Sequence, residues 1–219
     1  MRKIFVFVFF LSSTCLLQAN AQQQPWPFAD EIQAFQKEDS LQMPKAGGIL
    51  FVGSSSIRLW NDLKQRFSGY DVIQRGFGGC ELKDVVHYAD RIVLPYQPSK
   101  IFLYAGENDV ANGKKATEVR DAFVDFYNLV HKELPDAHIY FISIKPSPSR
   151  EKFMPAFSRT NERIRRFILR HPKDCSYIYA YQLMLDAKGM PRPELFRDDS
   201  LHMNKNGYDI WETLIRPYL

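Results

Sequence analysis

The strongest constraint on the fold of this chain is an alternation of short apolar runs with longer segments of helical periodicity. Five runs rich in β-branched and aromatic residues lie at residues 48–53, 70–76, 100–106, 138–144 and 176–181. Several are apolar throughout, which is typical of strands covered on both faces. The alternation therefore predicts a parallel β-sheet sandwiched between two layers of helices, an α/β fold.

The segments between these runs carry the helical pattern. The clearest spans residues 116–134, where apolar side chains recur every three or four residues and Pro135 follows. Two others span residues 154–169 and 208–215. Ligands of such sheets bind at the carboxyl ends of the strands, near the point where the strand order reverses. The residues that directly follow each run are therefore the first candidates for a functional site.

The first 21 residues have the pattern of a secretory signal peptide. Arg2 and Lys3 precede an apolar run at residues 4–11, and an Ala-Asn-Ala motif ends at Ala21. Serines and a threonine interrupt the apolar run before it reaches the ~20 residues that a membrane-spanning helix needs. We expect cleavage after Ala21 and a secreted or periplasmic protein without stable membrane insertion. Residues 22–46 are expected to form a lead-in with one short helix, and residues 47–219 a single domain.

The charge of the mature chain argues against one class of partner. Without Arg2 and Lys3, 27 Lys and Arg residues remain against 25 acidic residues, a net charge of +2. This charge is too small, and too evenly spread along the sequence, to favour nucleic acid. The mature chain keeps only Cys80 and Cys175, so its stability must come mainly from the core. The sequence leaves the oligomeric state open.

Small polar residues and glycines follow the first three apolar runs. Ser54, Ser55 and Ser56 follow the first run, Gly78 and Gly79 the second, and Asn108 the third. Each group alone is more typical of a helix cap or a tight turn. A serine hydroxyl, a backbone N–H that glycine leaves accessible and an Asn amide can also act together on one ligand.

An acid and an imidazole occur close together near the C-terminus. Asp199 and His202 are three residues apart before the last predicted helix. On a turn, such a pair can face the same side, so that the carboxylate holds Nδ1–H and Nε2 is left as a base. The other four histidines lack such a neighbour, and we interpret them as surface or core residues.

Taken in order, these four blocks resemble the SGNH hydrolases, also called GDSL-type esterases and lipases. The stretches LFVGSSSIRLW, RGFGG, GEND, SIKPSPSR and DSLHMNKNGY are similar to the branch that contains platelet-activating-factor acetylhydrolase subunits. The resemblance covers about residues 48–215. It implies a three-layer, flavodoxin-like α/β/α sandwich with five parallel strands in the order 2-1-3-4-5. That order places Cys80 and Cys175 at opposite edges of the sheet, so both are expected to be unpaired.

The resemblance also implies a role for each candidate residue. Ser55 takes the place of the nucleophile, His202 of the base and Asp199 of the group that orients it. The backbone N–H groups of Ser55 and Gly79 and the side chain of Asn108 would form the oxyanion hole. Neither a metal nor a cofactor is required. Ser54 replaces the family's Asp before the nucleophile, so the choice among the three serines rests on the alignment alone.

The function that the resemblance implies is hydrolysis of small-molecule or glycan esters. We expect short acyl groups, above all acetyl, on a carbohydrate. Two alternatives stay open: a lysophospholipase or thioesterase, and a non-catalytic carbohydrate-binding relative. Trp60 and Phe77 lie beside the predicted site in sequence. They either wall an acyl pocket or pack in the core.

Overall fold

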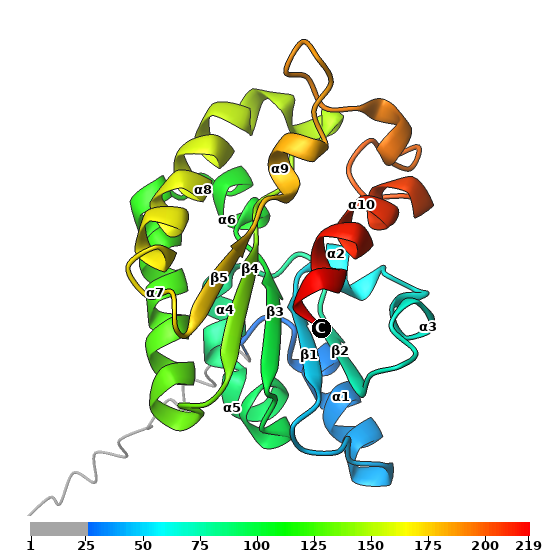
Figure 1. The fold of residues 1–219 in the computed structure, drawn as a ribbon, viewed down its shortest axis with the longest axis vertical. Helices are drawn as coiled ribbons and strands as arrows, with labels where there is room; N and C mark the ends of the chain where they lie inside the picture. The colour runs from blue at the N-terminus through cyan, green and yellow to red at the C-terminus, as the bar shows by residue number, and fades with distance from the viewer. Residues whose placement is uncertain (1–25) are drawn as a thin grey trace, which may run out of the picture.

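The computed structural model describes residues 26–219, which form a three-layer α/β/α sandwich (Figure 1). The predicted signal peptide, residues 1–21, lies outside the described residues. The sheet is parallel and has the order β2-β1-β3-β4-β5, which confirms the predicted fold class and strand order. Its strands are β1 (Ile49–Gly53), β2 (Val72–Gly76), β3 (Lys100–Tyr104), β4 (His138–Ile142) and β5 (Cys175–Ile178).

Helices cover both faces of the sheet. One face packs against α1 (Ala29–Leu41), α4 (Leu82–His87), α5 (Ala89–Ile92), α7 (Ala116–Glu133) and α8 (Met154–Ile168). The other packs against α2 (Ser55–Arg58), α3 (Leu63–Arg66) and α10 (Lys205–Ile215). The shorter elements are α6 (Glu107–Ala111), α9 (Ala180–Leu183) and the 3-10 helices η1 (Leu94–Tyr96), η2 (Pro148–Phe153), η3 (Pro193–Leu195) and η4 (Arg216–Tyr218). None of the helices described is long and apolar enough to cross a bilayer.

The inner strands β1, β3 and β4 are mostly apolar because each contributes to two cores. Leu50 and Val52 of β1 pack under α1 and α4, whereas Phe51 points to the opposite core. There its ring stacks between Phe67 and Phe102, with ring centroids 5.7 and 4.8 Å away. Successive side chains of a strand alternate between faces, so a strand buried on both faces has no polar positions.

Several predicted boundaries are wrong. β4 ends at Ile142, two residues before the predicted end, and α10 begins at Lys205, three residues before the predicted start. The sequence predicts that the fifth run extends to residue 181, but β5 ends at Ile178 because Ala180 begins α9, where the N–H of Tyr181 donates to Ser143 Oγ at 2.9 Å. The third run is predicted to extend to Gly106, which instead adopts a left-handed φ of 108°. The backbone therefore leaves the sheet at once after β3.

The lead-in segment packs on the domain that follows it. Its helix α1 has 13 residues, and Ile32 is fully buried in the core under β1 and β2. Trp26 Nε1 donates to Asp84 Oδ1 at 3.1 Å. At the other end of α1, Asp39 accepts a hydrogen bond from Arg75 of β2. These contacts join the lead-in to the edge of the sheet and to α4.

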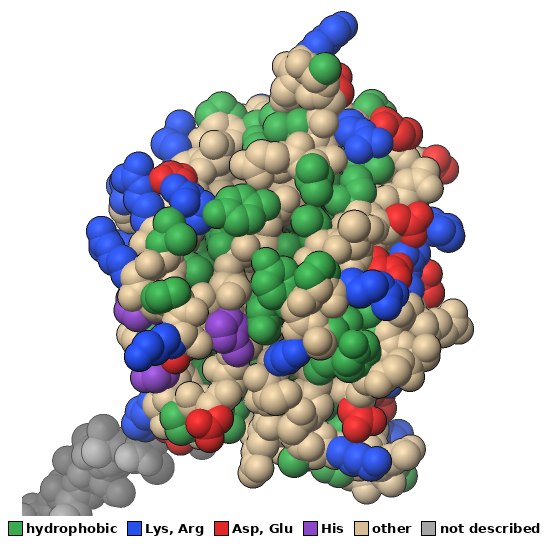
Figure 2. All heavy atoms as spheres, viewed as in Figure 1, with side chains coloured by type: hydrophobic (Ala, Val, Ile, Leu, Met, Phe, Trp, Pro, Cys, Tyr) green, Lys and Arg blue, Asp and Glu red, His purple; other side chains and the backbone are tan. Residues whose placement is uncertain are grey.

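The two cysteines lie at opposite edges of the sheet. Cys80 and Cys175 are buried and free, one after the edge strand β2 and the other in the opposite edge strand β5. Basic side chains are concentrated in one place on the surface. Lys and Arg side chains gather over α8 at the left edge of Figure 2, where Arg159, Arg163 and Arg170 help to line a groove of about 530 Å³.

Candidate active site

The turn from β1 into α2 leaves only one of its three serines accessible to a ligand. Gly53 ends β1 with a φ of 138°, and a Cβ there would lie 1.9 Å from the carbonyl oxygen of Tyr104, so only glycine fits. The chain then turns sharply, and Ser55 is the first residue of α2. Ser54 and Ser56 are each only 2% exposed, whereas Ser55 is partly exposed. Of these three residues, the fold therefore presents Ser55 to a ligand.

Ser55, His202 and Asp199 form a continuous hydrogen-bonded chain. His202 Nε2 lies 3.0 Å from Ser55 Oγ, and His202 Nδ1 lies 2.6 Å from Asp199 Oδ2. Burial raises the pKa of Asp199, but hydrogen bonds from the His202 side chain and from the N–H groups of His202 and Leu201 outweigh it and bring the pKa to about 2. An ionised carboxylate can only accept, so Nδ1 carries the proton and Nε2 offers its lone pair to the serine hydroxyl.

A tight turn carries the acid and the imidazole. Ser200 adopts a left-handed φ of 55°, which lets the chain reverse between Asp199 and His202. The carbonyl oxygen of Ser200 accepts hydrogen bonds from both the N–H and the Oγ of Ser149, at 3.0 and 2.9 Å. The side chain of His202 is 24% exposed and that of Asp199 is 47% exposed. The imidazole therefore remains open to a substrate.

Gly79 and Asn108 lie at the same edge of the sheet as Ser55, because β2, β1 and β3 are neighbours. Gly79 has a φ of 87°, a conformation that glycine reaches most readily. Asn108 Nδ2 donates to the carbonyl oxygen of Cys80 at 3.1 Å, and Asn108 Oδ1 accepts from Arg150 Nη2 at 3.0 Å. These two bonds fix which way the amide points. They leave the second hydrogen of Nδ2 available to a ligand.

Four charged residues around this site are not among those predicted from the sequence. The buried Glu107 and Lys145 form an ionic cluster beneath it with Arg150, which is partly buried. Asp109 accepts from the N–H of Leu82 at 3.1 and 3.3 Å, and burial raises its pKa to about 7 despite this bond. The segments GEND and SIKPSPSR contain these residues. The similarity of those segments to the family was the only sequence signal for them, and it assigned them no chemistry.

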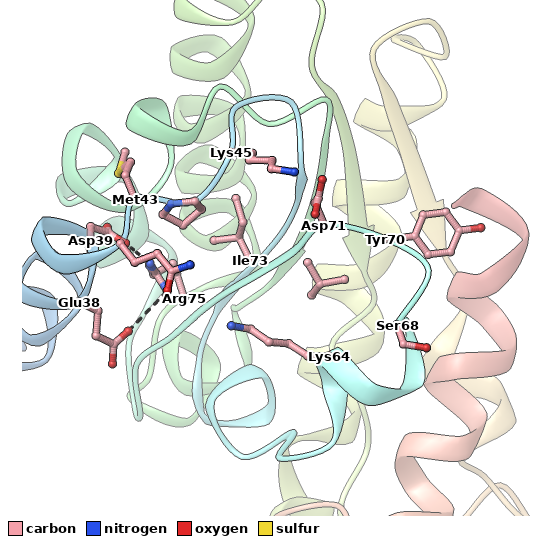
Figure 3. Close-up of a pocket in the computed structure, with 13 residues that line it drawn as sticks. Glu38, Asp39, Met43, Lys45, Lys64, Ser68, Tyr70, Asp71, Ile73 and Arg75 are labelled. Atoms are coloured by element: carbon pink, nitrogen blue, oxygen red, sulfur yellow. Dashed lines mark hydrogen bonds and ion pairs between the residues drawn. The ribbon is translucent and has the colours of Figure 1, made fainter.

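Two aromatic residues close to the site in sequence are buried, and the cavity in Figure 3 lies elsewhere. Trp60 and Phe77 are both fully buried in the core, so neither walls an acyl pocket. Figure 3 shows a cavity of about 640 Å³ between α1, α3 and β2, lined by Asp39, Lys64 and Tyr70 among others but by none of the candidate residues. Within residues 26–219, the structure contains no cluster of three or more His, Cys, Asp or Glu side chains that could hold a metal ion.

The chain is similar to known proteins in sequence and in fold. Residues 51–210 match the GDSL-like Lipase/Acylhydrolase family, which is well over half of the chain. No curated protein gives a significant sequence match. The structure superimposes on a GDSL-like lipase from Bacteroides thetaiotaomicron with a TM-score of 0.74 and 19% identity, covering 85% of this chain and 96% of that one.

Two further solved structures have the same fold. A member of the lipolytic G-D-S-L family from Veillonella parvula gives a TM-score of 0.64 at 17% identity, covering 78% of this chain and 97% of that one. A variant of an acetyl-xylooligosaccharide esterase from a Geobacillus species gives 0.60 at 13% identity, covering 79% and 94%. The fold and the family match agree with each other. The chain belongs to the GDSL-like lipase/acylhydrolase family of the SGNH hydrolase superfamily and is a hydrolase of ester bonds.

Proposed function

We propose that this hydrolase is an exported serine esterase that removes short acyl groups, above all acetyl, from a polar molecule such as a decorated polysaccharide. The observation that carries the catalytic part is the chain from Ser55 Oγ to His202 Nε2 at 3.0 Å and from His202 Nδ1 to Asp199 Oδ2 at 2.6 Å. A nucleophile, a base and a group that orients the base are thereby arranged in hydrogen-bonding order.

The first step is acylation of the serine. Ser55 Oγ attacks the ester carbonyl carbon while His202 Nε2 takes the hydroxyl proton. The carbonyl oxygen becomes an oxyanion, which accepts hydrogen bonds from the N–H groups of Ser55 and Gly79 and from Asn108 Nδ2. Ser55 begins α2, so its N–H is one of those that helix geometry leaves without an intrahelical acceptor. The oxyanion then collapses, and the imidazolium returns its proton to the departing alcohol.

The second step is hydrolysis of the acyl-enzyme. A water molecule gives a proton to His202 Nε2 and attacks the acyl carbonyl, and the same three donors stabilise the second oxyanion. Collapse releases the carboxylic acid and returns the proton to Ser55 Oγ. Asp199 stays ionised throughout because its pKa is about 2. Its negative charge stabilises the imidazolium in both steps.

Two observations support a short acyl group and a carbohydrate. The signal-peptide pattern of residues 1–21 would take the enzyme to the compartment where glycans are met. One structural neighbour is an acetyl-xylooligosaccharide esterase, and another is an acetyl esterase variant solved with an acetate ion. Both are distant in sequence. They support the substrate only as an analogy of fold.

A longer acyl chain is the second candidate. Three apolar side chains on the segment after β5 are exposed: Tyr179 (48%), Leu183 (50%) and Met190 (37%). They follow β5, whose carboxyl end lies at the same edge of the sheet as the proposed triad, three strands away from β1. A lysophospholipase would use exposed apolar groups on this side of the molecule to hold an acyl chain.

A panel of esters separates these functions. We expect kcat/KM to fall from acetyl to butyryl to long-chain p-nitrophenyl esters, and acetate to be released from acetylated xylan. Ser55→Ala is the control for turnover that does not come from the site. A preference for acyl chains longer than about eight carbons would favour the lysophospholipase. Absence of turnover on every ester would favour the non-catalytic relative. The N-terminus of the protein recovered from the periplasm or medium tests the expected cleavage after Ala21.

A further inference from the structure

Lys145 is a lysine buried beneath the candidate active site. It follows β4, and its side chain is only 1% exposed. A buried ammonium is very unfavourable unless it is paired and hydrogen-bonded. Lys145 Nζ lies 3.1 Å from Glu107 Oε2 and donates to the backbone carbonyl oxygen of Leu201 at 2.8 Å. It also lies 5.4 Å from the centre of the Phe196 ring. With partners on these three sides, the ammonium has a fixed position.

Leu201 lies within the turn that carries the base. The N–H groups of Leu201 and His202 both donate to Asp199 Oδ1 at 2.9 Å. Those bonds shape the turn internally but do not attach it to the rest of the protein. The exposed bonds from Ser149 to Ser200 attach its outer side. The bond from Lys145 to the Leu201 carbonyl attaches its buried side to the end of β4.

Glu107 connects Lys145 with the side of the site where Asn108 lies. Its side chain is 5% exposed, and it accepts from the hydroxyl of Tyr104 at 2.5 Å. Its carboxylate pairs with Lys145 and, at 3.3 Å, with Arg150 Nη1. Burial lowers the pKa of Lys145, and the negative charge of Glu107 opposes that lowering. One carboxylate therefore supports the turn of His202 through Lys145 and the amide of Asn108 through Arg150.

We propose that Lys145, held by Glu107, is a positioning residue that fixes the Leu201 carbonyl and thereby keeps the imidazole of His202 opposite Ser55. Its effect on turnover rests on the proposed function, whereas its effect on the position of His202 does not. If the ion pair served only the stability of the fold, a folded protein without it would retain both the position of His202 and kcat.

The test variant is the double substitution Lys145→Met with Glu107→Gln. Removing one member of a buried ion pair leaves an uncompensated charge and destabilises the fold, whereas the double variant removes both and leaves only Arg150, whose side chain is 19% exposed and reaches solvent. The Glu107→Gln change keeps a side-chain oxygen that can accept from Tyr104. The matched control is Val130→Ala. Val130 is fully buried near the end of α7, so its truncation destabilises the core through a cavity without touching the site.

The measurements are kcat and KM for an acetyl ester, and the NMR signal of the His202 Nδ1–H proton. We expect the double variant to fold, with kcat lower by about tenfold or more and KM within about twofold, because small displacements of catalytic groups reduce rate more than binding. The Nδ1–H signal should broaden or disappear in the double variant and persist in Val130→Ala.

Two results would overturn the proposal: a double variant that fails to fold while Val130→Ala folds, or one that folds with the kcat and Nδ1–H signal of the control. A wild-type protein that hydrolyses no ester, but whose Nδ1–H signal responds to the double substitution as expected, would instead refute the proposed function and leave the positioning role supported.

Discussion

His202 Nε2 lies 3.0 Å from Ser55 Oγ although the two residues are 147 positions apart in the sequence. Ser55 follows β1, and His202 precedes the last α-helix, α10. The hydroxyl of Tyr208 in α10 donates to the carbonyl oxygen of Ser56 at 3.0 Å, which joins the same two segments a second time. The contact between the serine and the imidazole therefore exists only once α10 has docked on the sheet.

The first prediction concerns the nucleophile. Ser55→Ala should lower kcat/KM for an acetyl ester by at least about 10⁴-fold without lowering the Tm, because the attacking oxygen is removed from a partly exposed position. Ser54→Ala and Ser56→Ala should keep most of the activity, since both side chains are buried. Mass spectrometry after treatment with a fluorophosphonate should find the adduct on Ser55. An adduct that persists in Ser55→Ala would assign the nucleophile to another residue.

The second prediction concerns pH. The pKa of Asp199 is about 2, so its carboxylate keeps its charge from pH 4 to 9. We therefore expect this carboxylate to add no proton of its own to the acid limb of log kcat/KM between pH 4 and 9. Asp199→Asn should lower kcat by about 10³-fold or more, because a neutral amide no longer fixes the tautomer or stabilises the imidazolium. An acid limb with a slope of two would contradict this assignment.

The third prediction concerns the oxyanion amide. Arg150→Met removes the donor to Asn108 Oδ1 and lets the amide turn. We expect kcat to fall by about 10- to 100-fold with little change in KM, which is part of the ~3 kcal/mol that a whole oxyanion donor contributes. Arg150→Lys should restore some of the loss. Arg159→Met, at an exposed position of α8, is the control and should leave kcat unchanged. Wild-type kcat in Arg150→Met would exclude this role for the arginine.

The fourth prediction concerns stability and Asp109. Burial raises the pKa of its carboxyl to about 7, so the native state binds its proton more tightly than the unfolded chain. Its contribution to stability is present at low pH and is lost as pH rises through about 7. The free energy of unfolding of the wild type should therefore decline from pH 5 to 8 relative to Asp109→Asn, by at most about 1.4 kcal/mol per pH unit. Parallel pH profiles from urea titrations would contradict the raised pKa.

The fifth prediction concerns the thiols. Cys80 and Cys175 follow or form opposite edge strands, so four strand spacings of about 4.8 Å separate them, whereas a disulfide needs Cα atoms within about 7 Å. Mature protein unfolded without reductant should release two titratable thiols. In the folded protein both should react slowly with a thiol reagent, because burial raises the pKa of each. Fewer than two thiols after unfolding would contradict the free state of the pair.

The fold class could be predicted from the sequence because it depends on the local pattern of apolar residues. The apolar runs and the helical spacing of α7 suffice for the layers, since a strand buried on both faces and an amphipathic helix each have a distinct periodicity. The candidate residues could be found because they directly follow strands. The choice of Ser55 over its neighbours could not be derived from pattern, because it depends on how Gly53 aims the turn.

The ionic cluster beneath the site could not be predicted from the sequence. Glu107 follows β3, and Lys145 and Arg150 follow β4, as charged surface residues commonly do. They are covered only because the turn before α10 packs over them. Trp60 has a similar ambiguity, because a large aromatic beside a site fits a pocket wall or a core equally well. Its complete burial depends on α10, which lies about 150 residues further along the chain.

The C-terminal end of the chain has a practical consequence. The carbonyl oxygen of Tyr218 accepts from Lys100 Nζ at 2.6 Å, and Lys100 begins β3, whereas Asn108 follows the end of that strand. Leu219 therefore leaves the molecule on the side away from Ser55. A solid support or an added binding module attached after Leu219 would therefore leave the proposed triad open to a polymer.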